Sequence, residues 1–349
     1  IKLAEESLMD ENRPGKLRAA VIGVGYLGRF HAQKYQLNPD VDLVGVVDTN
    51  AENAAQVAEQ AGAQAFTDYR DVLPMVDLVS IVVPTRDHYA VAKGCFEAGC
   101  HVLLEKPVTR TVEEADALIQ LAESRGLVFQ VGHLERFNPA VMALKDVLKN
   151  PLFIESNRLA PFNPRGTDVN VVLDLMIHDI DILLSLVPYP VKTINSVGVP
   201  VLSEEVDIAN ARLQFENGCI ANVTASRASR EGLRKMRIFQ QDAYISIDFQ
   251  SREIAIYKKK KGLNLIPGLP NVGVEKRSFE KGDPLKDEIF AFVAAVRDGT
   301  PPLVTAADRR RALEVALRIS GKLWHEVKEY SCLNRTYSGE EHLPGAPGL

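Results

Sequence analysis

The sequence predicts an α/β Rossmann dinucleotide-binding domain followed by an α+β domain with a large, mostly antiparallel sheet. In the first third of the chain, short apolar runs alternate with helical stretches, a pattern typical of a parallel sheet covered on both faces. After about residue 190, predicted strands follow one another without intervening helices, which is typical of an antiparallel sheet. At 349 residues, two domains are expected.

The elements of the first domain are predicted from its apolar runs and from the glycines and prolines between them. Helices are expected at 29–37, 52–61 and 87–98, the last closed by Gly99. Strands are expected at 18–24, 41–48, 77–84, 101–104 and 127–133. We predict an N-terminal extension at 1–17, a NAD-binding Rossmann domain at 18–136, a substrate-binding and oligomerisation domain at 137–330 and an irregular tail at 331–349.

The second domain is predicted to begin with a long helix at 168–187 and to end with helices at 285–298 and 306–324. Asn217-Gly218, between two of its strands, is a strong hairpin signal. The strands are expected at 191–200, 206–216, 219–228, 233–240, 243–249 and 253–258. With few helices to cover six strands, one face of this sheet is expected to be apolar and buried against another subunit, so a homo-oligomer is expected.

Composition excludes several classes of protein. Apolar residues make up 46% and charged residues 25%, as in ordinary globular proteins, and no apolar run is long enough to cross a bilayer. The net charge of −5 argues against a general nucleic-acid or membrane-surface binder. The four cysteines are scattered, and no signal-peptide pattern opens the chain. A cytoplasmic protein without a metal site is expected.

A glycine-rich loop follows the first predicted strand. It fits G-x-G-x-x-G, opens a helix, and is followed by an acid, Asp48, at the end of the next strand. This context predicts a dinucleotide site, in which glycines allow close approach to pyrophosphate and a carboxylate holds the ribose hydroxyls. Because Asp48 would repel a 2′-phosphate, NAD is preferred over NADP. The loop residues are Gly23, Val24, Gly25, Tyr26, Leu27 and Gly28.

A polar stripe lies on the otherwise apolar helix 168–187. Asp174, His178, Asp181 and Ser185 recur at helical spacing, so we expect one narrow face to meet a ligand, water or a partner. A structural histidine is the alternative. An Asp-x-x-x-His metal pair is also possible, but no third ligand cluster accompanies it, and we predict no metal.

Two stretches together resemble the Gfo/Idh/MocA oxidoreductase family. They are VPTRDHYAVAKGCFEAGCHVLLEKP at 83–107 and DLMIHDID at 174–181, and the similarity runs from about residue 17 to 325. One departure is that the glycines which often precede the helix aspartate are here Val171, Val172 and Leu173. This leaves the approach of the substrate open.

The resemblance implies the residues of an alcohol dehydrogenase. Lys106, Asp174 and His178 match the catalytic lysine, aspartate and histidine, with His178 as the base and Lys106 stabilising the developing alkoxide. Pro107 is expected to limit the freedom of Lys106, and a cis peptide bond is one way in which it could do so. Residues implied at the cofactor, beside the glycine loop and Asp48, are Pro84, Thr85, His88, Glu105 and Lys106. Glu105 is expected to pair with the cofactor's ribose or with Lys106.

Segments 135–145 and 157–168 resemble a branch that oxidises the 3-hydroxyl of UDP-N-acetylglucosamine. Its 3-keto product is used by a partner sugar aminotransferase, with lipopolysaccharide biosynthesis the implied setting. Expected substrate residues are Arg136, Arg158, Asn163, Arg165 and Asp181, with Arg158 and Arg165 cradling the diphosphate near a helix start at Asp168. An ordinary rigid connection is the alternative for this loop.

Other functions stay open at this point. The substrate of a related dehydrogenase could be a free sugar, inositol or a linear tetrapyrrole, and the family also includes NAD-assisted glycosidases. A non-catalytic dinucleotide-sensing regulator is disfavoured because Lys106, Asp174 and His178 are all present. Dimers or tetramers are implied by the resemblance.

Overall fold

The structure, a computed structural model, describes residues 15–163, 169–259, 272–280, 282–302 and 304–337, with side chains described except at 145–146 and 324–337. It divides into two compact units. The first unit comprises the described parts of 1–143 and 280–313, and the second those of 144–279 and 314–349. The expectations for residues 1–14 and 338–349 fall outside the described residues.

The first unit contains a six-stranded parallel sheet in the order β3-β2-β1-β4-β5-β6. The strands that the sequence predicted are present, and β3 is an additional short strand. Their bounds are β1 (Leu17–Ile22), β2 (Val41–Val47), β3 (Gln64–Phe66), β4 (Leu78–Ile81), β5 (His101–Leu104) and β6 (Phe129–Val131). Strands β1, β4 and β5 inside the sheet and β6 at one edge are almost wholly buried, which explains their continuous apolar sequences.

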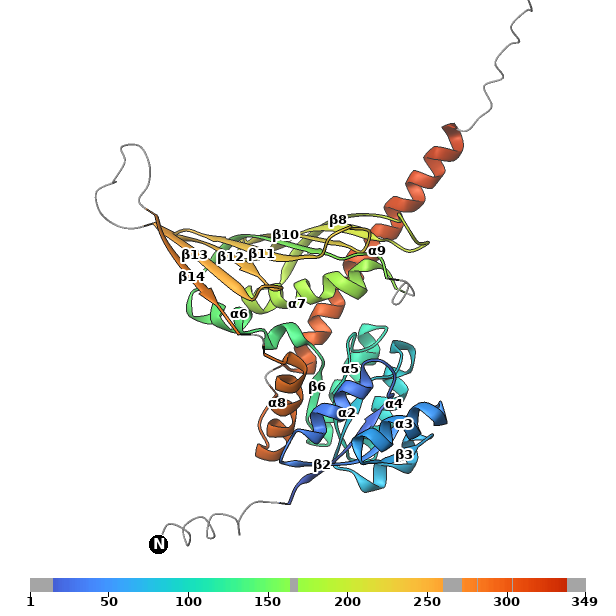
Figure 1. Cartoon of the computed structure of the whole chain (residues 1–349). Helices are drawn as coiled ribbons and strands as arrows, with labels where there is room; N and C mark the ends of the chain where they lie inside the picture. The colour runs from blue at the N-terminus through green and yellow to red at the C-terminus, as the bar shows by residue number, and fades with distance from the viewer. Residues whose placement is uncertain (1–14, 164–168, 260–271, 281, 303, 338–349) are drawn as a thin grey trace, which may run out of the picture. The chain divides into compact units, whose positions relative to one another are not determined.

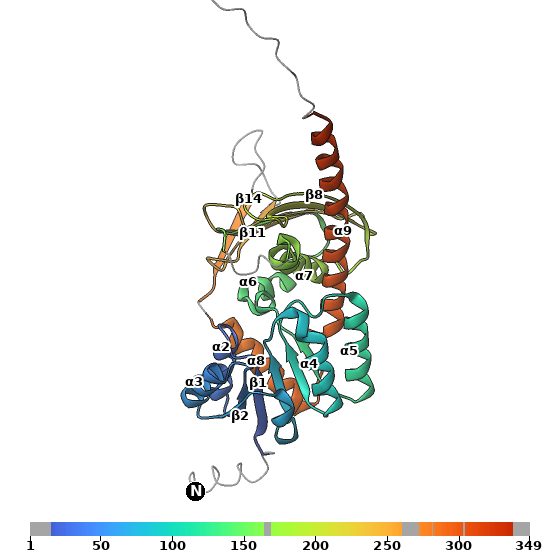
Figure 2. The same cartoon turned by 90° about the vertical axis from the view of Figure 1, so that its right-hand side faces the viewer.

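Helices cover both faces of this sheet (Figures 1 and 2). They are α2 (Gly28–Gln36), α3 (Ala51–Ala61), α4 (Thr85–Glu97) and α5 (Val112–Ser124), with short turns η1 (Tyr69–Asp71), η2 (Leu73–Met75), η3 (Leu134–Phe137) and α6 (Pro139–Met142). Figure 2 shows α2 and α3 on one side of the sheet and α4 and α5 on the other. Helix α5, capped by Thr111, was not among the predicted elements.

Helix α8 (Pro284–Asp298) belongs to the first unit, although the sequence analysis assigned residues 285–298 to the second domain. Four of its apolar residues, Leu285, Ile289, Phe292 and Val293, are buried in the same core cluster as β1 and α2. Their spacing at i, i+4, i+7 and i+8 forms one helical face. The predicted boundary at 136/137 is therefore replaced by a first unit made of two chain segments.

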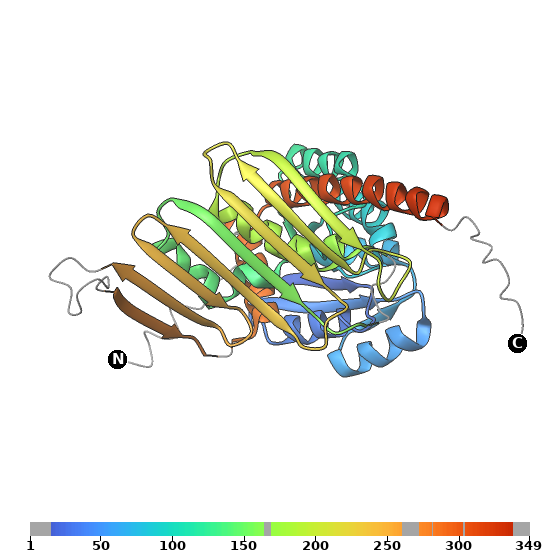
Figure 3. The same ribbon diagram turned by 90° about the horizontal axis from the view of Figure 1, so that it is seen from above.

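The second unit is built on an eight-stranded sheet in the order β14-β13-β12-β11-β7-β10-β9-β8, seen face-on in Figure 3. All neighbouring pairs are antiparallel except β7 and β10. The strands are β7 (Pro151–Leu159), β8 (Val191–Val199), β9 (Ile208–Phe215), β10 (Ile220–Ser226), β11 (Leu233–Gln240), β12 (Ala243–Asp248), β13 (Glu253–Lys259) and β14 (Val272–Ser278). The predicted hairpin at Asn217-Gly218 is confirmed, and Gly218 takes the left-handed φ of +87°.

Two strands of this sheet were not predicted. The sequence analysis interpreted residues 157–168 as a loop, whereas Asn157–Leu159 form the end of β7. Strand β14 at the sheet edge carries almost no buried side chains and so lacks the apolar alternation that marks a strand.

The remaining helical elements are η4 (Ala143–Asp146), η5 (Val172–Met176), α7 (Ile177–Leu186) and α9 (Ala306–Tyr337). The predicted helix at 168–187 is therefore present from residue 171, but residues 172–176 form a π-helical turn. Helix α9 continues to Tyr337, so the prediction of an irregular tail is wrong for 331–337. The glycines and prolines of that tail all come after residue 338 and cannot stop the helix earlier. None of the helices in the described part of the chain has the length and apolarity needed to span a membrane.

Candidate functional site

The glycine loop of the first unit shows why each glycine is required. A Cβ on Gly23 would lie 2.7 Å from the carbonyl oxygen of Val82, and one on Gly28 would lie 1.9 Å from the oxygen of Gly23. These two glycines therefore allow the strand–turn–helix backbone to pack. A Cβ on Gly25 would meet no atom within 4 Å. The middle glycine thus leaves open space, as a close-approaching pyrophosphate requires.

The start of α2 and the end of β2 complete this part of the site. The first turn of α2 contains no acidic residue, so its N-terminal N–H groups present uncompensated positive charge. Asp48 lies just past β2, where Oδ2 accepts a hydrogen bond from the N–H of Val24 at 3.1 Å and Oδ1 accepts one from Asn50 at 2.9 Å. A carboxylate has further lone pairs for ribose hydroxyls. The residues present therefore fit a bound dinucleotide.

Sheet topology places the predicted cofactor residues at the carboxyl ends of the parallel strands. The chain runs from β1 outward to β3 and then returns to β4, so the strand order reverses between β1 and β4. Ligands of such sheets bind at the carboxyl ends of the strands beside this reversal. Gly23 follows β1, Asp48 follows β2, Pro84 and Thr85 follow β4, and Lys106 follows β5.

Both ring nitrogens of His88 lie within hydrogen-bond distance of backbone carbonyls. Its Nδ1 lies 2.8 Å from the carbonyl oxygen of Pro107 and its Nε2 lies 3.0 Å from that of Val83. Burial lowers the pKa of His88, although these two hydrogen bonds act in the opposite direction. His88 connects the turn after Lys106 to the segment before α4, and its expected contact with the cofactor stays a prediction.

Glu105 also faces the protein interior. Its Oε1 lies 3.1 Å from Nε2 of His31, and its Oε2 accepts a hydrogen bond from the backbone N–H of Lys106 at 3.2 Å. Burial alone would raise the pKa of Glu105, but the hydrogen bond and the charge interaction with His31 lower it below its usual value. Lys106 itself is half-buried, and its peptide bond to Pro107 is cis. Glu105 therefore holds the lysine backbone in place, and its expected contact with the cofactor's ribose stays a prediction.

Sequence reasoning missed His31 and Glu288, which share this buried polar cluster. Glu288, on α8, accepts a hydrogen bond from the N–H of His133 and is fully buried. Burial and the nearby negative charge of Glu105 raise the pKa of Glu288 to about 8. His31 could have been found, because it lies on the buried face of α2 with Gly28, Ala32 and Tyr35.

The second unit carries the other predicted catalytic pair, Asp174 and His178. Asp174 lies in the π-helical turn and His178 in the first turn of α7, and both are half-buried. π-Helical turns are frequent at functional sites. The π-helical turn shifts Asp174 around the helix axis relative to the predicted stripe, whereas His178, Asp181 and Ser185 all lie in the regular helix α7. Ser185 donates its hydroxyl to the carbonyl of Ile182 at 2.6 Å, and Asp181 is buried.

Arg158 is the clearest departure from the predicted site. It lies in β7, is 3% exposed, and donates from Nε to Oδ2 of Asp179 at 2.5 Å. Asp179 also accepts a hydrogen bond from Ser156. Breaking this pair would leave a buried charge uncompensated, so the pairing with Asp179 competes with the expected contact between Arg158 and a diphosphate. Arg158 holds the helix at the residue next to His178.

The other predicted substrate residues fall in several places. Arg136 is half-buried in the turn Leu134–Phe137 of the first unit, and Asn163 is exposed in the second. Arg165 and Asp168 lie outside the described residues.

Comparison with known proteins identifies the family. Residues 17–133 match the model of an oxidoreductase family with an NAD-binding Rossmann fold, and residues 155–246 match the GFO/IDH/MocA C-terminal domain. The chain is also 44% identical over 304 residues to UDP-N-acetylglucosamine 3-dehydrogenase of Acidithiobacillus ferrooxidans, which covers 87% of this chain and 96% of that protein. The chain belongs to the Gfo/Idh/MocA family.

Solved structures agree with this membership. A solved structure of UDP-N-acetylglucosamine 3-dehydrogenase from Acidithiobacillus ferrooxidans aligns with a TM-score of 0.82 at 43% identity, covering 87% of this chain and 96% of that one. Among more distant relatives, the scyllo-inositol 2-dehydrogenase (NAD(+)) of Bacillus subtilis is 27% identical, covering 93% of this chain and 99% of that protein. The protein is therefore an oxidoreductase-family member whose first unit is an NAD-binding Rossmann fold.

Proposed function

We propose that the protein oxidises the 3-hydroxyl of UDP-N-acetylglucosamine to a 3-keto sugar with NAD. The observation that carries the proposal is the 44% identity to an enzyme with that activity, extending over 96% of its length. The inositol dehydrogenase is considerably more distant, at 27% identity. Because one fold serves many substrates, this difference in identity matters more than the shared architecture.

We assign the chemistry to Lys106, Asp174 and His178. When bound beside these residues, NAD would supply the acceptor for the hydride of the sugar carbon. The neutral imidazole of His178 accepts the proton from the hydroxyl near pH 7. The ammonium of Lys106 stabilises the developing negative charge on the same oxygen, and Asp174 orients these groups. The hydrogen bond from the N–H of Lys106 to Glu105 supports a fixed lysine backbone.

The diphosphate requires local positive charge, since the protein has a net charge of −5. We assign Arg136 and Arg165 to the substrate, together with Asn163, and leave Arg158 out because it pairs with Asp179. Asp181 is kept as a candidate for the sugar hydroxyls. Mutation of Arg136 or Arg165 tests this assignment. If the arginine binds the diphosphate, its removal should raise KM for the UDP-sugar and leave KM for NAD unchanged.

The test is a panel of ligands with the NAD-bound protein. UDP-N-acetylglucosamine should raise the melting temperature and be oxidised when a sugar aminotransferase traps the product, and UDP alone should compete. Free N-acetylglucosamine at the same concentration should do neither. Turnover of inositol or a free hexose, with no response to any UDP-sugar, would replace the proposal by one of the alternative dehydrogenase activities.

We further propose a homo-oligomer, a dimer or tetramer, formed through the outer face of the large sheet. That face carries a row of aromatic rings on adjacent strands, Phe153, Phe239, Tyr244 and Tyr257, with neighbouring centroids 5.0–5.8 Å apart. Val197, Val199 and Ile208 on β8 and β9 add exposed apolar area, 36–51% exposed. A monomer by light scattering at micromolar concentration would contradict this assembly.

The setting of the reaction is also a proposal. A 3-keto nucleotide sugar suits a partner aminotransferase and a role in lipopolysaccharide biosynthesis. A cytoplasmic location is supported by Cys95, Cys100 and Cys219, which are buried free thiols. Co-purification or coupled turnover with an aminotransferase from the same cell would test the partnership.

A further inference from the structure

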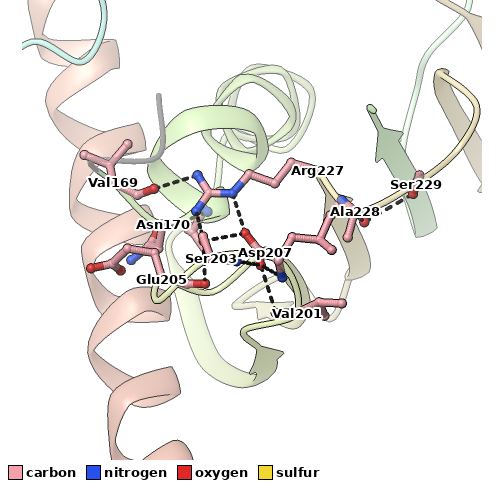
Figure 4. Close-up of polar contacts among 12 residues, drawn as sticks. Val169, Asn170, Val201, Ser203, Glu205, Asp207, Arg227, Ala228 and Ser229 are labelled. Atoms are coloured by element: carbon pink, nitrogen blue, oxygen red, sulfur yellow. Dashed lines mark hydrogen bonds and ion pairs between the residues drawn. The ribbon is translucent and has the colours of Figure 1, made fainter. Parts of the chain in front are cut away.

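A buried ion pair in the second unit lies where the segment leading to Asp174 and His178 begins. Arg227 follows β10 and Asp207 precedes β9, and they are 3% and 0% exposed. Arg227 donates from Nε to Oδ1 of Asp207 at 2.8 Å (Figure 4). Isolated charges at this depth are costly, so each requires the other and further hydrogen bonds. Neither residue was singled out by the sequence or used in the proposed chemistry.

The terminal nitrogens of the guanidinium reach two other segments. One terminal nitrogen donates to the carbonyl oxygen of Val169 at 2.8 Å, and the other donates to Oγ of Ser203 at 3.1 Å. Figure 4 shows all three acceptors arranged around the guanidinium. Val169 comes three residues before the π-helical turn that contains Asp174. The fork geometry of arginine therefore joins the chain before that turn to the Asp207 loop.

Asp207 fixes its own loop with its remaining acceptor sites. Its Oδ2 accepts hydrogen bonds from the backbone N–H groups of Val201 and Ser203, both at 2.8 Å, and also from that of Leu202. The Ser203 hydroxyl donates to Oδ1 at 2.7 Å. Burial alone would raise the pKa of Asp207, but the hydrogen bond from Arg227 and those from the loop hold it well below its usual range. The carboxylate is therefore ionised and the loop is tied to it.

The start of the helix is held by neighbouring contacts of the same loop. The N–H of Val171 donates to the carbonyl of Val206 at 2.9 Å. The side chain of Asn170 accepts from the N–H groups of Val172 and Leu173, the first residues of the turn. Residues 169–173 are thus held at three points. The Val169 carbonyl accepts from Arg227, the Val171 N–H donates to Val206, and the Asn170 side chain caps the π-helical turn.

We propose that Arg227 is a positioning residue, which fixes the helix start through Val169 and thereby sets where Asp174 and His178 point. This inference rests on the proposed function for the roles of Asp174 and His178. The contact to Val169 is the essential one, because the pairing with Asp207 alone would stabilise the loop without reaching the helix. Misplacing catalytic groups by about 1 Å can lower a rate by about 10²-fold.

The test compares Arg227→Lys with Ser203→Ala in the full chain. A lysine ammonium can pair with Asp207 but cannot also reach the Val169 oxygen in a fixed fork. We expect Arg227→Lys to lower kcat for UDP-N-acetylglucosamine by about 10–10²-fold, with the Kd for NAD within about twofold. Hydrogen exchange at the amides of residues 170–178 should accelerate by about tenfold or more.

Ser203→Ala is the matched control. It removes two hydrogen bonds from the same ion pair but leaves the bond to Val169 in place. We expect a lower melting temperature with kcat and the exchange at 170–178 close to wild type. Equal kcat losses in the two variants, or a folded Arg227→Lys with wild-type kcat and exchange, would overturn the proposal.

A double variant covers the case in which Arg227→Lys does not fold. Arg227→Met with Asp207→Asn removes both buried charges together, and it should show the same loss of kcat and faster exchange at 170–178. If neither variant folds, the pair serves stability alone and the positioning role is rejected. If the wild-type protein does not oxidise UDP-N-acetylglucosamine at all, the proposed function fails, while the exchange comparison still decides the positioning role.

Discussion

Glu105 and His31 form a buried hydrogen-bonded pair directly behind Lys106, with Oε1 and Nε2 3.1 Å apart. The second carboxylate oxygen accepts the N–H of Lys106, so the pair connects helix α2 to the lysine backbone. A Cβ at Gly132 would lie 3.1 Å from this carboxylate, so any larger residue there would press against it. The pair is therefore enclosed on several sides before any ligand binds.

His31→Leu should destabilise the protein because it leaves a buried carboxylate without its charged hydrogen bond. We expect the free energy of unfolding to fall by about 1.5–3 kcal/mol, the range for bonds to charged groups. Tyr35→Phe is the matched control on the same helix, since it removes the neutral bond between the Tyr35 hydroxyl and Ser80 at 2.8 Å. Its expected cost is about 0.5–1.5 kcal/mol. Equal costs by urea denaturation would indicate that Glu105 is not ionised.

Glu288 should make stability depend on pH. Its pKa is about 8 in the folded protein and 4.5 as a model value, so between these pH values the folded state holds a proton that the unfolded state has lost. Stability should therefore fall as pH rises from about 4.5 to 8, and level off above. Glu288→Gln does not titrate at this position. The difference in free energy of unfolding, variant minus wild type, should therefore increase by at least about 1.4 kcal/mol as pH rises from 5 to 8. A constant difference across that range would contradict the shift.

Asp48 should determine the choice between NAD and NADP. With the carboxylate beside the adenine ribose, NAD should bind at least about tenfold more tightly than NADP, which corresponds to about 1.4 kcal/mol. Asp48→Ser should reduce the ratio of the Kd for NADP to the Kd for NAD, as measured by calorimetry. Asp42→Ser, at the opposite end of β2 and exposed, makes the same change in net charge and should leave the ratio unchanged. Equal affinity for both dinucleotides in the wild type would show that the acid is misassigned.

The catalytic assignments predict large effects on turnover with little effect on cofactor binding. Lys106→Met and His178→Asn should each lower kcat by roughly 10²–10⁴-fold, because one removes charge stabilisation and the other the base. NAD affinity should be nearly intact in both. Ser185→Ala, on the same helix as His178, loses only a bond to its own backbone and should retain activity. Near-wild-type turnover of a folded variant would remove that residue from the mechanism.

The fold was predictable where apolar periodicity is strong. The central strands of the parallel sheet and the hairpin at Asn217-Gly218 are confirmed because burial and turn chemistry are visible in neighbouring residues. Strand β7 was missed because two of its inward residues are Ser156 and Arg158, whose burial depends on Asp179 in a distant helix. A periodicity argument cannot recognise a polar residue that is buried by a partner 21 positions away.

The candidate site was predictable in its motifs but not in its supporting contacts. Gly23, Asp48 and Lys106 follow strands and could be placed from the chain order. The roles of His88, Glu105 and Arg158 could not, because each depends on a hydrogen-bond partner far along the chain or supplied by backbone. The π-helical turn at 172–176 likewise has no signal in the spacing of apolar residues.

The two-segment construction of the first unit has a consequence during synthesis. A ribosome that has made residue 143 has produced the whole parallel sheet, but the core still lacks Ile289 and Phe292 of α8. Residues 144–279 must be translated first, which takes on the order of ten seconds at about 5–20 residues per second. During that interval the apolar surface around β1 and α2 stays uncovered on the nascent chain. The Rossmann unit therefore cannot complete its core until α8 has been translated, although its sheet strands are made well before.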